Sequence, residues 1–481
     1  MTLRQRRLLV RTLLFLFSLN AATIAFYLLF YFPQRSPAVD AAISTQTLDK
    51  DRQRYPTLKQ WPTLPSFLPW IPSPAPPLSS CEAYFGHGFS RRIDALGAGE
   101  DGGGWLRCHY SETLRSSVCE GAQIRMDPSR IIMSDGGESL EVVIGRGEEE
   151  ELPKYESGAF EIDGGSLGKE GMRAVDEEFL EKYVQRGEVQ SHTMRMLMES
   201  MRLVGHQKLD CSEWIEEPTV LVTRFEYANV FHTVTDWYSA YVSSRVTDLP
   251  YRPNLVFVDG HCKTQLEETW EAIFSSVRYA KNFSGPVCFR HAVFAPLGYE
   301  TALFKGLTQH INCQGISAGK LRQDPDIHRT ARLSEFGYNV LFVRREDYLA
   351  HPRHSGKVES RLSNEQEVFD AIKIWAASQD KCRINVVNGL FAHMHMKEQL
   401  EAIQEASVIV GAHGAGLTHL VAAREGTKVL EIISSMYRRP HFALISEWKG
   451  LEYHPIYLSG SYAVPAKVID ELSHIMGSIG C

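Results

Sequence analysis

Short apolar runs alternate with amphipathic stretches from Cys211 onward, and this alternation restricts the possible folds more than any other feature of the sequence. Runs rich in valine, isoleucine and phenylalanine are typical of buried strands, and amphipathic stretches between them are typical of helices that cover a parallel sheet. Strands are predicted to begin at Thr219, Asn254, Phe289, Asn339, Arg383, Ser407 and Lys428, with helices from Met396 and Gly416. The pattern therefore predicts an α/β protein.

The segment over residues 81–210 differs, because runs of glycine and acidic residues interrupt it. The clearest are GAGEDGGG, from Gly97, and GRGEEEELPKYESGAFEIDGG, from Gly145. We interpret these runs as loops inserted into a first α/β unit. The simplest architecture is then two Rossmann-like domains that face a cleft, an N-terminal one over residues 81–335 and a C-terminal one over residues 336–481.

The composition excludes several other classes of protein. With 44% hydrophobic and 23% charged residues, the chain is close to the average of globular proteins, so collagen, coiled coil and wholesale disorder do not fit. Lys and Arg number 51 against 58 Asp and Glu, a formal charge of −7. A chain without a basic surplus is not expected to bind nucleic acid.

Residues 13–32 form an apolar run without a charge. At about 1.5 Å per residue, a helix of this length spans the roughly 30 Å hydrocarbon core of a bilayer. Four arginines precede it, at Arg4, Arg6, Arg7 and Arg11. Positive residues stay in the cytosol, so we predict a single-pass type II membrane protein with a cytosolic tail over residues 1–12 and a lumenal remainder. A cleaved signal peptide is the alternative, since residues 21–25 include small residues, but the apolar run continues beyond them.

Residues 33–80 are rich in proline, which excludes helix interiors and favours an extended chain. We interpret this segment as a stem between the anchor and the lumenal domain. Trp61, Phe67 and Trp70 are unusually apolar for a linker, so part of the stem is expected to pack on the domain.

The nine cysteines all follow the anchor and include no C-x-x-C pair. In an oxidising lumen this spacing favours disulfides over a zinc site, and the odd count leaves at least one cysteine outside an intramolecular pair. Asn282 begins an Asn-Phe-Ser sequon and is the candidate site of N-glycosylation.

The strongest local signal is VIVGAHGAGLTHLVAA, over residues 408–423. A buried strand is predicted to end in a glycine-rich turn and to continue into a helix. Glycines let backbone N–H groups approach a ligand, and a helix N-terminus favours negative charge, so the turn can hold a diphosphate. The candidate donor-binding residues here are His413, Gly414, Ala415, Gly416 and Thr418. The alternative is that small residues merely permit a tight crossing from strand to helix.

Three further residues end predicted strands, where ligands gather in open α/β sheets. Arg344 and Arg345 end the strand from Asn339, and guanidinium groups match diphosphate geometry. Side chains alternate along a strand, so one of the two faces the cleft; we expect Arg344. Glu431 ends another strand and is a candidate acceptor for ribose hydroxyls, or else a surface residue.

His232 and Asp236 lie four residues apart on a helix predicted from about Val230, so they share a face. A histidine and a carboxylate together can accept a proton in general-base catalysis. The alternative is a structural polar pair.

Candidate metal ligands are few. The Asp324-Pro325-Asp326 motif lies in a polar stretch and not after an apolar strand, Asp49 and Asp51 lie in the stem, and His393 with His395 do not complete a coordination shell. We therefore predict no tightly bound metal.

Several stretches together resemble glycosyltransferase family 61, and the resemblance covers most of the chain from about Cys211. They are CSEWIEEPTVLVTRFEYANVFHTVTDWYSAYVSSRV from Cys211, FVDGHCKTQLEETW from Phe257, GPVCFRHAVFAPLGYETALFKG from Gly285, LFVRREDYLAHPR from Leu341 and VGAHGAGLTHL from Val410. The resemblance implies a GT-B-like Golgi membrane enzyme that inverts at the anomeric carbon without a bound metal. It also implies UDP-xylose as donor and the 2-hydroxyl of the core β-mannose of N-glycans as acceptor.

The family's Asn-x-aromatic-x-x-x-x-Asp helix matches Asn229, Phe231 and Asp236, with His232 at a variable position. The resemblance therefore makes Asp236 the favoured base and the turn after Gly411 the donor diphosphate site. One departure is that similar proteins carry a longer segment before the strand from Asn339, whereas here Gly337 meets Tyr338 directly. A related transferase with another donor or a xylan acceptor, and a non-catalytic Golgi scaffold, are the alternatives.

Overall fold

The computed structural model describes residues 55–61, 77–78, 80–84, 88–97, 103–165, 170–186, 192–205, 209–309, 337–345 and 361–481. They form a mixed α/β fold with several sheets, and those from Leu58 to Cys481 belong to one compact unit. The predicted anchor over residues 13–32, the Asp49 and Asp324 motifs and the predicted boundary after residue 335 lie outside the described residues. Within the described residues, no helix is both long enough and apolar enough to span a bilayer.

The C-terminal part is built on a five-stranded parallel sheet of order β16-β15-β17-β18-β19. The strands are β15 (Tyr338–Val343), β16 (Ile384–Gly389), β17 (Val408–Ala412), β18 (Lys428–Ile433) and β19 (Glu452–Tyr457). The first four match the strands predicted from the apolar runs. The sequence did not indicate β19, because its burial is low and a proline interrupts it.

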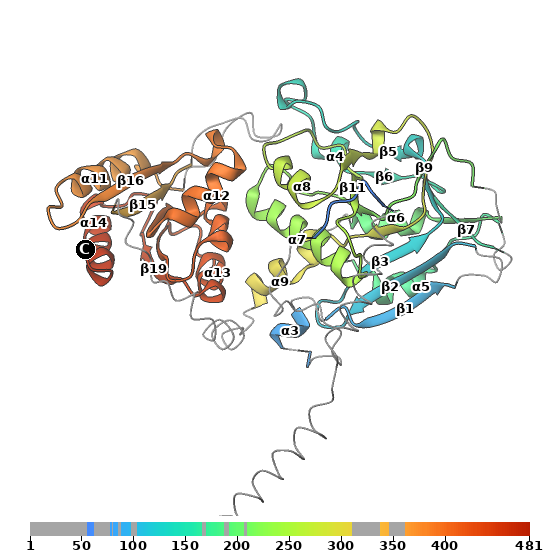
Figure 1. Cartoon of the computed structure of the whole chain (residues 1–481), viewed down its shortest axis with the longest axis horizontal. Helices are drawn as coiled ribbons and strands as arrows, with labels where there is room; N and C mark the ends of the chain where they lie inside the picture. The colour runs from blue at the N-terminus through green and yellow to red at the C-terminus, as the bar shows by residue number, and fades with distance from the viewer. Residues whose placement is uncertain are drawn as a thin grey trace, which may run out of the picture. The chain divides into compact units, whose positions relative to one another are not determined.

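Helices cover both faces of this sheet, as Figure 1 shows for its C-terminal half. Val340 and Phe342 of β15 pack with α11 (Glu365–Ala377) and α14 (Pro465–Ser478). Leu341 and Val343 pack on the other face with α12 (Met396–Glu405), the 3₁₀ helix η7 (Ala415–Ala422) and α13 (His441–Lys449). This strict alternation explains why β15 is apolar on consecutive positions, as expected for a strand buried on both faces.

The strand order reverses between β15 and β17, which are neighbours although β16 separates them in the chain. In doubly wound sheets of this order, ligands bind at the carboxyl ends of the two strands beside the reversal. Here these ends carry Arg344 and Arg345 after β15, and His413 and Gly414 after β17. The topology thus brings two of the predicted donor-binding segments to one edge of the sheet.

The N-terminal part contains a seven-stranded mixed sheet of order β1-β2-β3-β14-β10-β11-β12. Its parallel half holds β14 (Ala292–Phe294), β10 (Thr219–Val222), β11 (Asn254–Phe257) and β12 (Val277–Tyr279). Its antiparallel half holds β1 (Arg91–Leu96), β2 (Trp105–Ser111) and β3 (Ser116–Ala122). The helices of this part that matter below are α7 (Val230–Val246), α8 (Glu267–Ile273) and α9 (Ala302–Gln309).

A second five-stranded sheet has the order β8-β7-β4-β13-β9. It consists of β8 (Arg202–Val204), β7 (Phe160–Asp163), β4 (Ile124–Met126), β13 (Val287–Phe289) and β9 (Glu213–Ile215). A two-stranded ribbon, β5 (Ile131–Ile132) with β6 (Lys154–Tyr155), and the helices α3 (Cys81–Tyr84), α4 (Glu148–Glu151), α5 (Glu177–Tyr183) and α6 (Thr193–Ser200) complete this part.

The prediction that the acidic run from Gly145 is a loop was therefore wrong. The acidic run from Gly145 contains α4, β6 and β7, and Phe160 and Ile162 of β7 are fully buried in the core. Such short strands lack a long apolar pattern, because each buries two or three side chains. The strand predicted from Phe289 is in fact two strands, β13 and β14, which belong to different sheets.

Three disulfides tie described elements together: Cys108–Cys119 between β2 and β3, Cys211–Cys288 beside the β9–β13 pair, and Cys382–Cys481 at the C-terminus. The prediction of disulfides is confirmed. Cys262 is buried and is the unpaired cysteine among the described residues. Asn282 is exposed, as a glycosylated residue must be.

Part of the predicted stem packs on the domain through a segment that we call the stem clasp, residues Lys59, Gln60 and Trp61. The Lys59 ammonium donates to the carbonyls of Glu271 (2.8 Å) and Phe274 (3.0 Å) at the end of α8. Trp61 donates to the Leu249 carbonyl at 3.2 Å and packs edge-on against Tyr241 of α7. The stem clasp therefore belongs to the folded unit and covers the C-terminal end of α7.

Candidate active site

A cavity of about 610 Å³ lies where α7, η4 (Gly298–Glu300) and α9 meet the turn after β17 and the start of α13. It is large enough for a nucleotide-sized ligand. Its wall consists of Asn229, Phe231, His232, Tyr299, Phe304, Leu307, Arg361, His413, Gly414, Ala415, Arg439, Pro440, His441 and Phe442. Four of these, His232, His413, Gly414 and Ala415, are residues that the sequence predicted.

The turn after β17 presents backbone to the cavity. His413 is fixed by its own N–H, which donates to the Ile432 carbonyl of β18 at 2.9 Å. A Cβ on Gly414 would lie 2.2 Å from Nη1 of Arg345, so the close approach of that guanidinium requires glycine. The turn then enters η7, whose first residue is Ala415. The predicted helix after the turn is a 3₁₀ helix and not an α-helix.

Of the two candidate arginines, the structure brings Arg345 and not Arg344 to this turn. Arg344 is directed to α11, where it donates to Gln366 at 2.8 Å and to Glu365 at 3.4 Å and lies 5.0 Å over the Phe369 ring. The expectation that Arg344 faces the cleft is therefore wrong. Alternation fails here because β15 ends at Val343, one residue before the two arginines.

Glu431 does not reach the cavity either. Its side chain is fully buried, one oxygen is 2.5 Å from Nδ1 of His413, and the other accepts a hydrogen bond from Tyr453 at 2.5 Å. A carboxylate held in this way has no exposed oxygen for ribose hydroxyls. The structure therefore contradicts the predicted ribose contact and places Glu431 behind His413.

Gly416 and Thr418 belong to η7 but are not part of the cavity wall. A Cβ on Gly416 would lie 2.9 Å from Cγ1 of Val343, so this glycine allows η7 to pack on β15. The Thr418 hydroxyl is buried and has no hydrogen-bond partner among the described residues. The tight-crossing alternative thus explains Gly416, whereas Gly414 and Ala415 face the cavity.

His232 and Asp236 share a face of α7, as predicted, but they do not form a pair. His232 lies on the cavity wall, and its Nδ1 has no hydrogen-bond partner among the described residues. Asp236 lies one turn deeper, where its Oδ1 accepts from the Gly298 N–H at 3.2 Å. The structure therefore puts His232 at the cavity and Asp236 behind it.

The protonation states follow from these positions. Burial, with smaller contributions from His441 and Arg439, lowers the pKa of His232 to about 4, so its ring is neutral at pH 7. Burial raises the pKa of Asp236 to about 8, and the charge of Asp259 adds to the shift, so this carboxyl keeps its proton at pH 7. A neutral imidazole can accept a proton, whereas a protonated carboxyl cannot.

The sequence reasoning missed two charged residues and one histidine of the cavity wall. Arg361 lies 3.2 Å over the Tyr437 ring, Arg439 is exposed, and the His441 ring stacks on Phe231 with a centroid distance of 5.0 Å. Burial lowers the pKa of His441 to about 4. The signal for Arg439 and His441 was present, because both follow the carboxyl end of β18.

Comparisons with known proteins bear on this cavity. The family model Glycosyltransferase 61 matches residues 180–430, which include α7 and the turn after β17. A β-1,2-xylosyltransferase of Oryza sativa subsp. japonica is 60% identical over 518 residues, which cover 99% of this chain and 96% of that protein. A β-1,2-xylosyltransferase of Arabidopsis thaliana is 53% identical over 528 residues, or 98% of this chain and 99% of that protein.

The chain belongs to glycosyltransferase family 61. The predicted glycosyltransferase activity is confirmed, and identity at this level over nearly the whole length makes the chain a β-1,2-xylosyltransferase. The similarity to an EGF domain-specific O-linked N-acetylglucosamine transferase of Gallus gallus is weaker, at 22% over 328 residues, 58% of this chain and 55% of that protein. The 518-residue alignment is longer than this chain of 481 residues, so the rice relative carries residues that this chain lacks.

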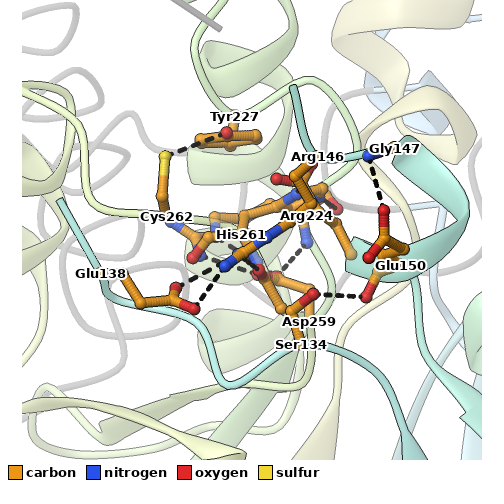
Figure 2. Close-up of polar contacts among 12 residues, drawn as sticks. Ser134, Glu138, Arg146, Gly147, Glu150, Arg224, Tyr227, Asp259, His261 and Cys262 are labelled. Atoms are coloured by element: carbon orange, nitrogen blue, oxygen red, sulfur yellow. Dashed lines mark hydrogen bonds and ion pairs between the residues drawn. The ribbon is translucent and has the colours of Figure 1, made fainter. Parts of the chain in front are cut away.

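In this family member a buried polar network holds the segment that leads into α7 (Figure 2). Arg224, just after β10, donates to Asp259 at 2.7 Å and to Glu267 at 3.2 Å, and its guanidinium lies 3.8 Å over the Phe257 ring. The side chain of Arg224 is 1% exposed and that of Asp259 is fully buried. The charges of Asp259 and Glu267 thus keep Arg224 protonated against the cost of burial.

His261 links this network to the acidic run. Its Nδ1 lies 3.0 Å from Glu151, its Nε2 lies 2.9 Å from the Arg224 carbonyl, and its ring stacks on Tyr227 with a centroid distance of 4.2 Å. Figure 2 also shows Cys262 beside Tyr227, with 3.1 Å between sulfur and hydroxyl oxygen. The network therefore fixes residues 224–229, which end where α7 begins.

The described residues contain no group of three or more His, Cys, Asp and Glu side chains that could hold a metal ion. His395 is exposed and contacts Glu268 at 3.0 Å, which raises its pKa. Neither His393 nor His395 belongs to the cavity wall.

Proposed function

We propose that this enzyme transfers xylose from UDP-xylose to the 2-hydroxyl of the core β-mannose of N-glycans. The observation that carries the proposal is the cavity in which the turn after β17, at the reversal of strand order, faces the histidine of α7. The names of the rice and Arabidopsis relatives support the sugar and the linkage. We further interpret the fold as GT-B-like, with the parallel C-terminal sheet as the donor side and the seven-stranded sheet as the acceptor side.

The donor diphosphate is assigned to the turn formed by Gly414 and Ala415, with Arg439 and Arg361 on the same cavity wall. Backbone amides and guanidinium groups are suitable donors for phosphate oxygens. Arg345, which lies against Gly414, supports the turn. When the bond between xylose C1 and the β-phosphate oxygen breaks, negative charge develops on UDP, and donors that are already in place lower the barrier.

The proton of the attacking hydroxyl is assigned to His232. This ring lies on the cavity wall and is neutral at pH 7, so it can act as the general base while the acceptor oxygen attacks C1 in line. Asp236 occupies the position that the family motif indicates, but it is buried and keeps its proton at pH 7. We therefore give Asp236 the role of holding the Gly298 turn, which carries Tyr299 to the cavity next to His232.

The test is transfer by the full-length, detergent-solubilised chain. With UDP-xylose and a biantennary N-glycan, mass spectrometry is expected to show an increment of one pentose. UDP-N-acetylglucosamine, UDP-arabinose and a xylan acceptor serve as controls and are expected to give no product. Product with one of these controls instead would indicate a related transferase of the family with another donor or acceptor. Binding of UDP without any product would support the scaffold alternative.

Two further proposals belong to the same enzyme. We propose that transfer needs no divalent metal, so the rate in EDTA is expected to equal the rate with added Mn²⁺. We also propose a type II Golgi membrane location through residues 13–32. In intact Golgi vesicles, protease should leave residues 33–481 uncut until detergent is added, and cleavage without detergent would reverse the orientation.

A further inference from the structure

Three side chains form a hydrogen-bonded chain across three neighbouring strands of the C-terminal sheet. Tyr453 of β19 donates to Oε2 of Glu431 at 2.5 Å, and Oε1 of Glu431 lies 2.5 Å from Nδ1 of His413, just after β17. Glu431 is paired in register with Gly411 of β17, and Tyr453 with Val429 of β18, so the tyrosine reaches the acid diagonally. The chain ends at His413, which lies on the cavity wall.

Stability does not account for an acid at this position. Glu431 is fully buried on the sheet face that also carries Ile409 and Val429, which pack on η7 and α13 in an apolar cluster. Burying a carboxylate away from water costs free energy, and the interactions with its partners rarely offset the whole cost. Apolar replacements of equal volume are often neutral or stabilising. We therefore look for a role of Glu431 in the function of the cavity.

His413 is the group through which Glu431 can act. Because Glu431 occupies Nδ1, the remaining ring nitrogen of His413 is Nε2, and the contact with Glu431 fixes the orientation of the ring. The ring is also held by Phe442, edge-on at 5.1 Å. Burial and the charge of Glu431 keep the Tyr453 hydroxyl protonated, so it remains a donor.

We infer that Glu431 and Tyr453 are positioning residues of the transfer reaction, which hold His413 so that its Nε2–H donates to the diphosphate of the departing UDP. The inference rests on the proposed function. As the bond from C1 breaks, its electron pair stays on the β-phosphate oxygen, and the hydrogen bond that Nε2–H of His413 donates is strongest at that moment. Glu431 thus serves the nucleotide indirectly.

Other charged or titratable groups surround His413 and must be considered in any pH experiment. His441 of α13 lies 6.5 Å away between ring centroids, Arg345 lies against Gly414, and His232, Arg361 and Arg439 share the cavity wall. For this reason the decisive test is a double-mutant cycle at one pH, and the pH profile is a second readout.

The cycle uses the full-length wild type, His413→Gln, Glu431→Gln and the double variant, with UDP affinity measured by calorimetry and kcat measured with UDP-xylose and the N-glycan. His413→Gln is expected to weaken UDP binding and kcat by about 30-fold and Glu431→Gln by about 10-fold. If Glu431 acts through His413, the double variant matches His413→Gln within about 2-fold. Losses that multiply to about 300-fold would mean that Glu431 acts on its own and would overturn the inference.

Tyr453→Phe keeps the test decisive if Glu431→Gln does not fold, since it removes a single hydroxyl. It is expected to lower kcat by about 3-fold in the wild type and to change nothing in His413→Gln. It should also shift the alkaline limb of the kcat profile, where the donated proton is lost, in the direction in which Glu431→Gln shifts it, which a purely structural role would not do. Tyr457→Phe on the same strand, 62% exposed, is the matched control and is expected to change neither value. An equal loss from Tyr453→Phe in both backgrounds would overturn the inference.

The result also separates the inference from the proposed function. A wild type that neither binds UDP nor transfers xylose would overturn both. A wild type that transfers xylose, combined with an additive cycle, would overturn the inference alone.

Discussion

Two polar sites of this enzyme lie at carboxyl ends of parallel strands, and they differ in what their charged groups touch. At β10 and β11, Arg224, Asp259 and His261 are buried and contact one another. At β17 and β18, His413 is held from behind by Glu431 but lies on the wall of a 610 Å³ cavity. The comparison teaches that position at a strand end does not by itself indicate a ligand site; an open wall beside the strand end is also needed.

We call the buried site of Arg224, Asp259 and His261 the closed site, and the site of His413 on the cavity wall the open site. The largest effect is expected when the closed site loses the cation of Arg224. Arg224→Met leaves Asp259 and Glu267 buried without their partner, which should lower the free energy of unfolding by about 3–5 kcal/mol. Urea unfolding followed by circular dichroism measures the change. Arg290→Met is the control, because its pair with Glu216 is exposed, and it should cost about 1 kcal/mol or less. Equal losses from the two variants would erase the distinction between the sites.

The open site should lose chemistry and not stability. His232→Ala is expected to lower kcat by about 100-fold or more, because the proposed proton acceptor is gone, while UDP affinity and the melting temperature change little. Steady-state kinetics with UDP-xylose and calorimetry with UDP measure the two effects. His474→Ala, an exposed histidine of α14, is the control. Wild-type kcat in His232→Ala would remove this residue from the mechanism.

Asp236 lies between the two sites, and its protonation is expected to make the free energy of unfolding depend on pH. Its folded pKa of about 8 is above its usual value near 4, so the unfolded chain releases the proton more readily, and the free energy of unfolding falls as pH rises from about 4 to about 8. Asp236→Asn cannot titrate. Its stability relative to the wild type should therefore rise between pH 5 and pH 8, by at most about 4 kcal/mol at about 1.4 kcal/mol per unit.

Denaturant unfolding at both pH values measures this difference. Asp470→Asn, an exposed acid of α14, is the control and should show no comparable trend. A pH-independent difference between Asp236→Asn and the wild type would mean that Asp236 is ionised in the folded enzyme. In that case the carboxylate, and not His232, would be the better candidate for the base.

The smallest effect is expected at the edge of the closed site. Cys262→Ser keeps a donor beside the Tyr227 hydroxyl, whereas Cys262→Ala removes it. Both variants should stay within about 1–2 kcal/mol of the wild type, with the alanine variant about 1 kcal/mol less stable than the serine variant. The comparison is made by urea unfolding under identical conditions. A less stable serine variant would show that the site tolerates no hydroxyl and is apolar at this point.

The features that the sequence predicted correctly depend on repetition along the chain. The strands from Asn339 and Ser407 are buried on both faces, so several consecutive residues carry the same signal. The glycine turn followed from the same logic, because a glycine cluster directly after such a strand marks a crossover. In contrast, β13 and β14 bury three residues each and leave no pattern that separates them.

The errors at the site have a common physical cause. The spacing of residues in the sequence indicates which face of an element a side chain shares, but not how deeply that side chain is buried. His232 and Asp236 are on one face of α7, yet side chains four apart stack along the helix axis, so one reaches the cavity and the other the interior. Arg344 and Arg345 follow the last residue of β15, where alternation no longer applies. Glu431 was predicted to end a strand, but β18 continues to Ile433, and Glu431 is buried inside the strand against Tyr453 and His413, which are distant in sequence.

The stem clasp has a consequence for which acceptors the enzyme can meet. If residues 13–32 anchor the enzyme as proposed, residues 33–57 alone connect the membrane to the folded unit, because Lys59, Gln60 and Trp61 are already part of that unit. At about 3.6 Å per fully extended residue, this connection measures at most about 90 Å. Under that proposal, the clasp limits how far the folded unit can lie from the bilayer, and with it the depth of lumen that the enzyme samples.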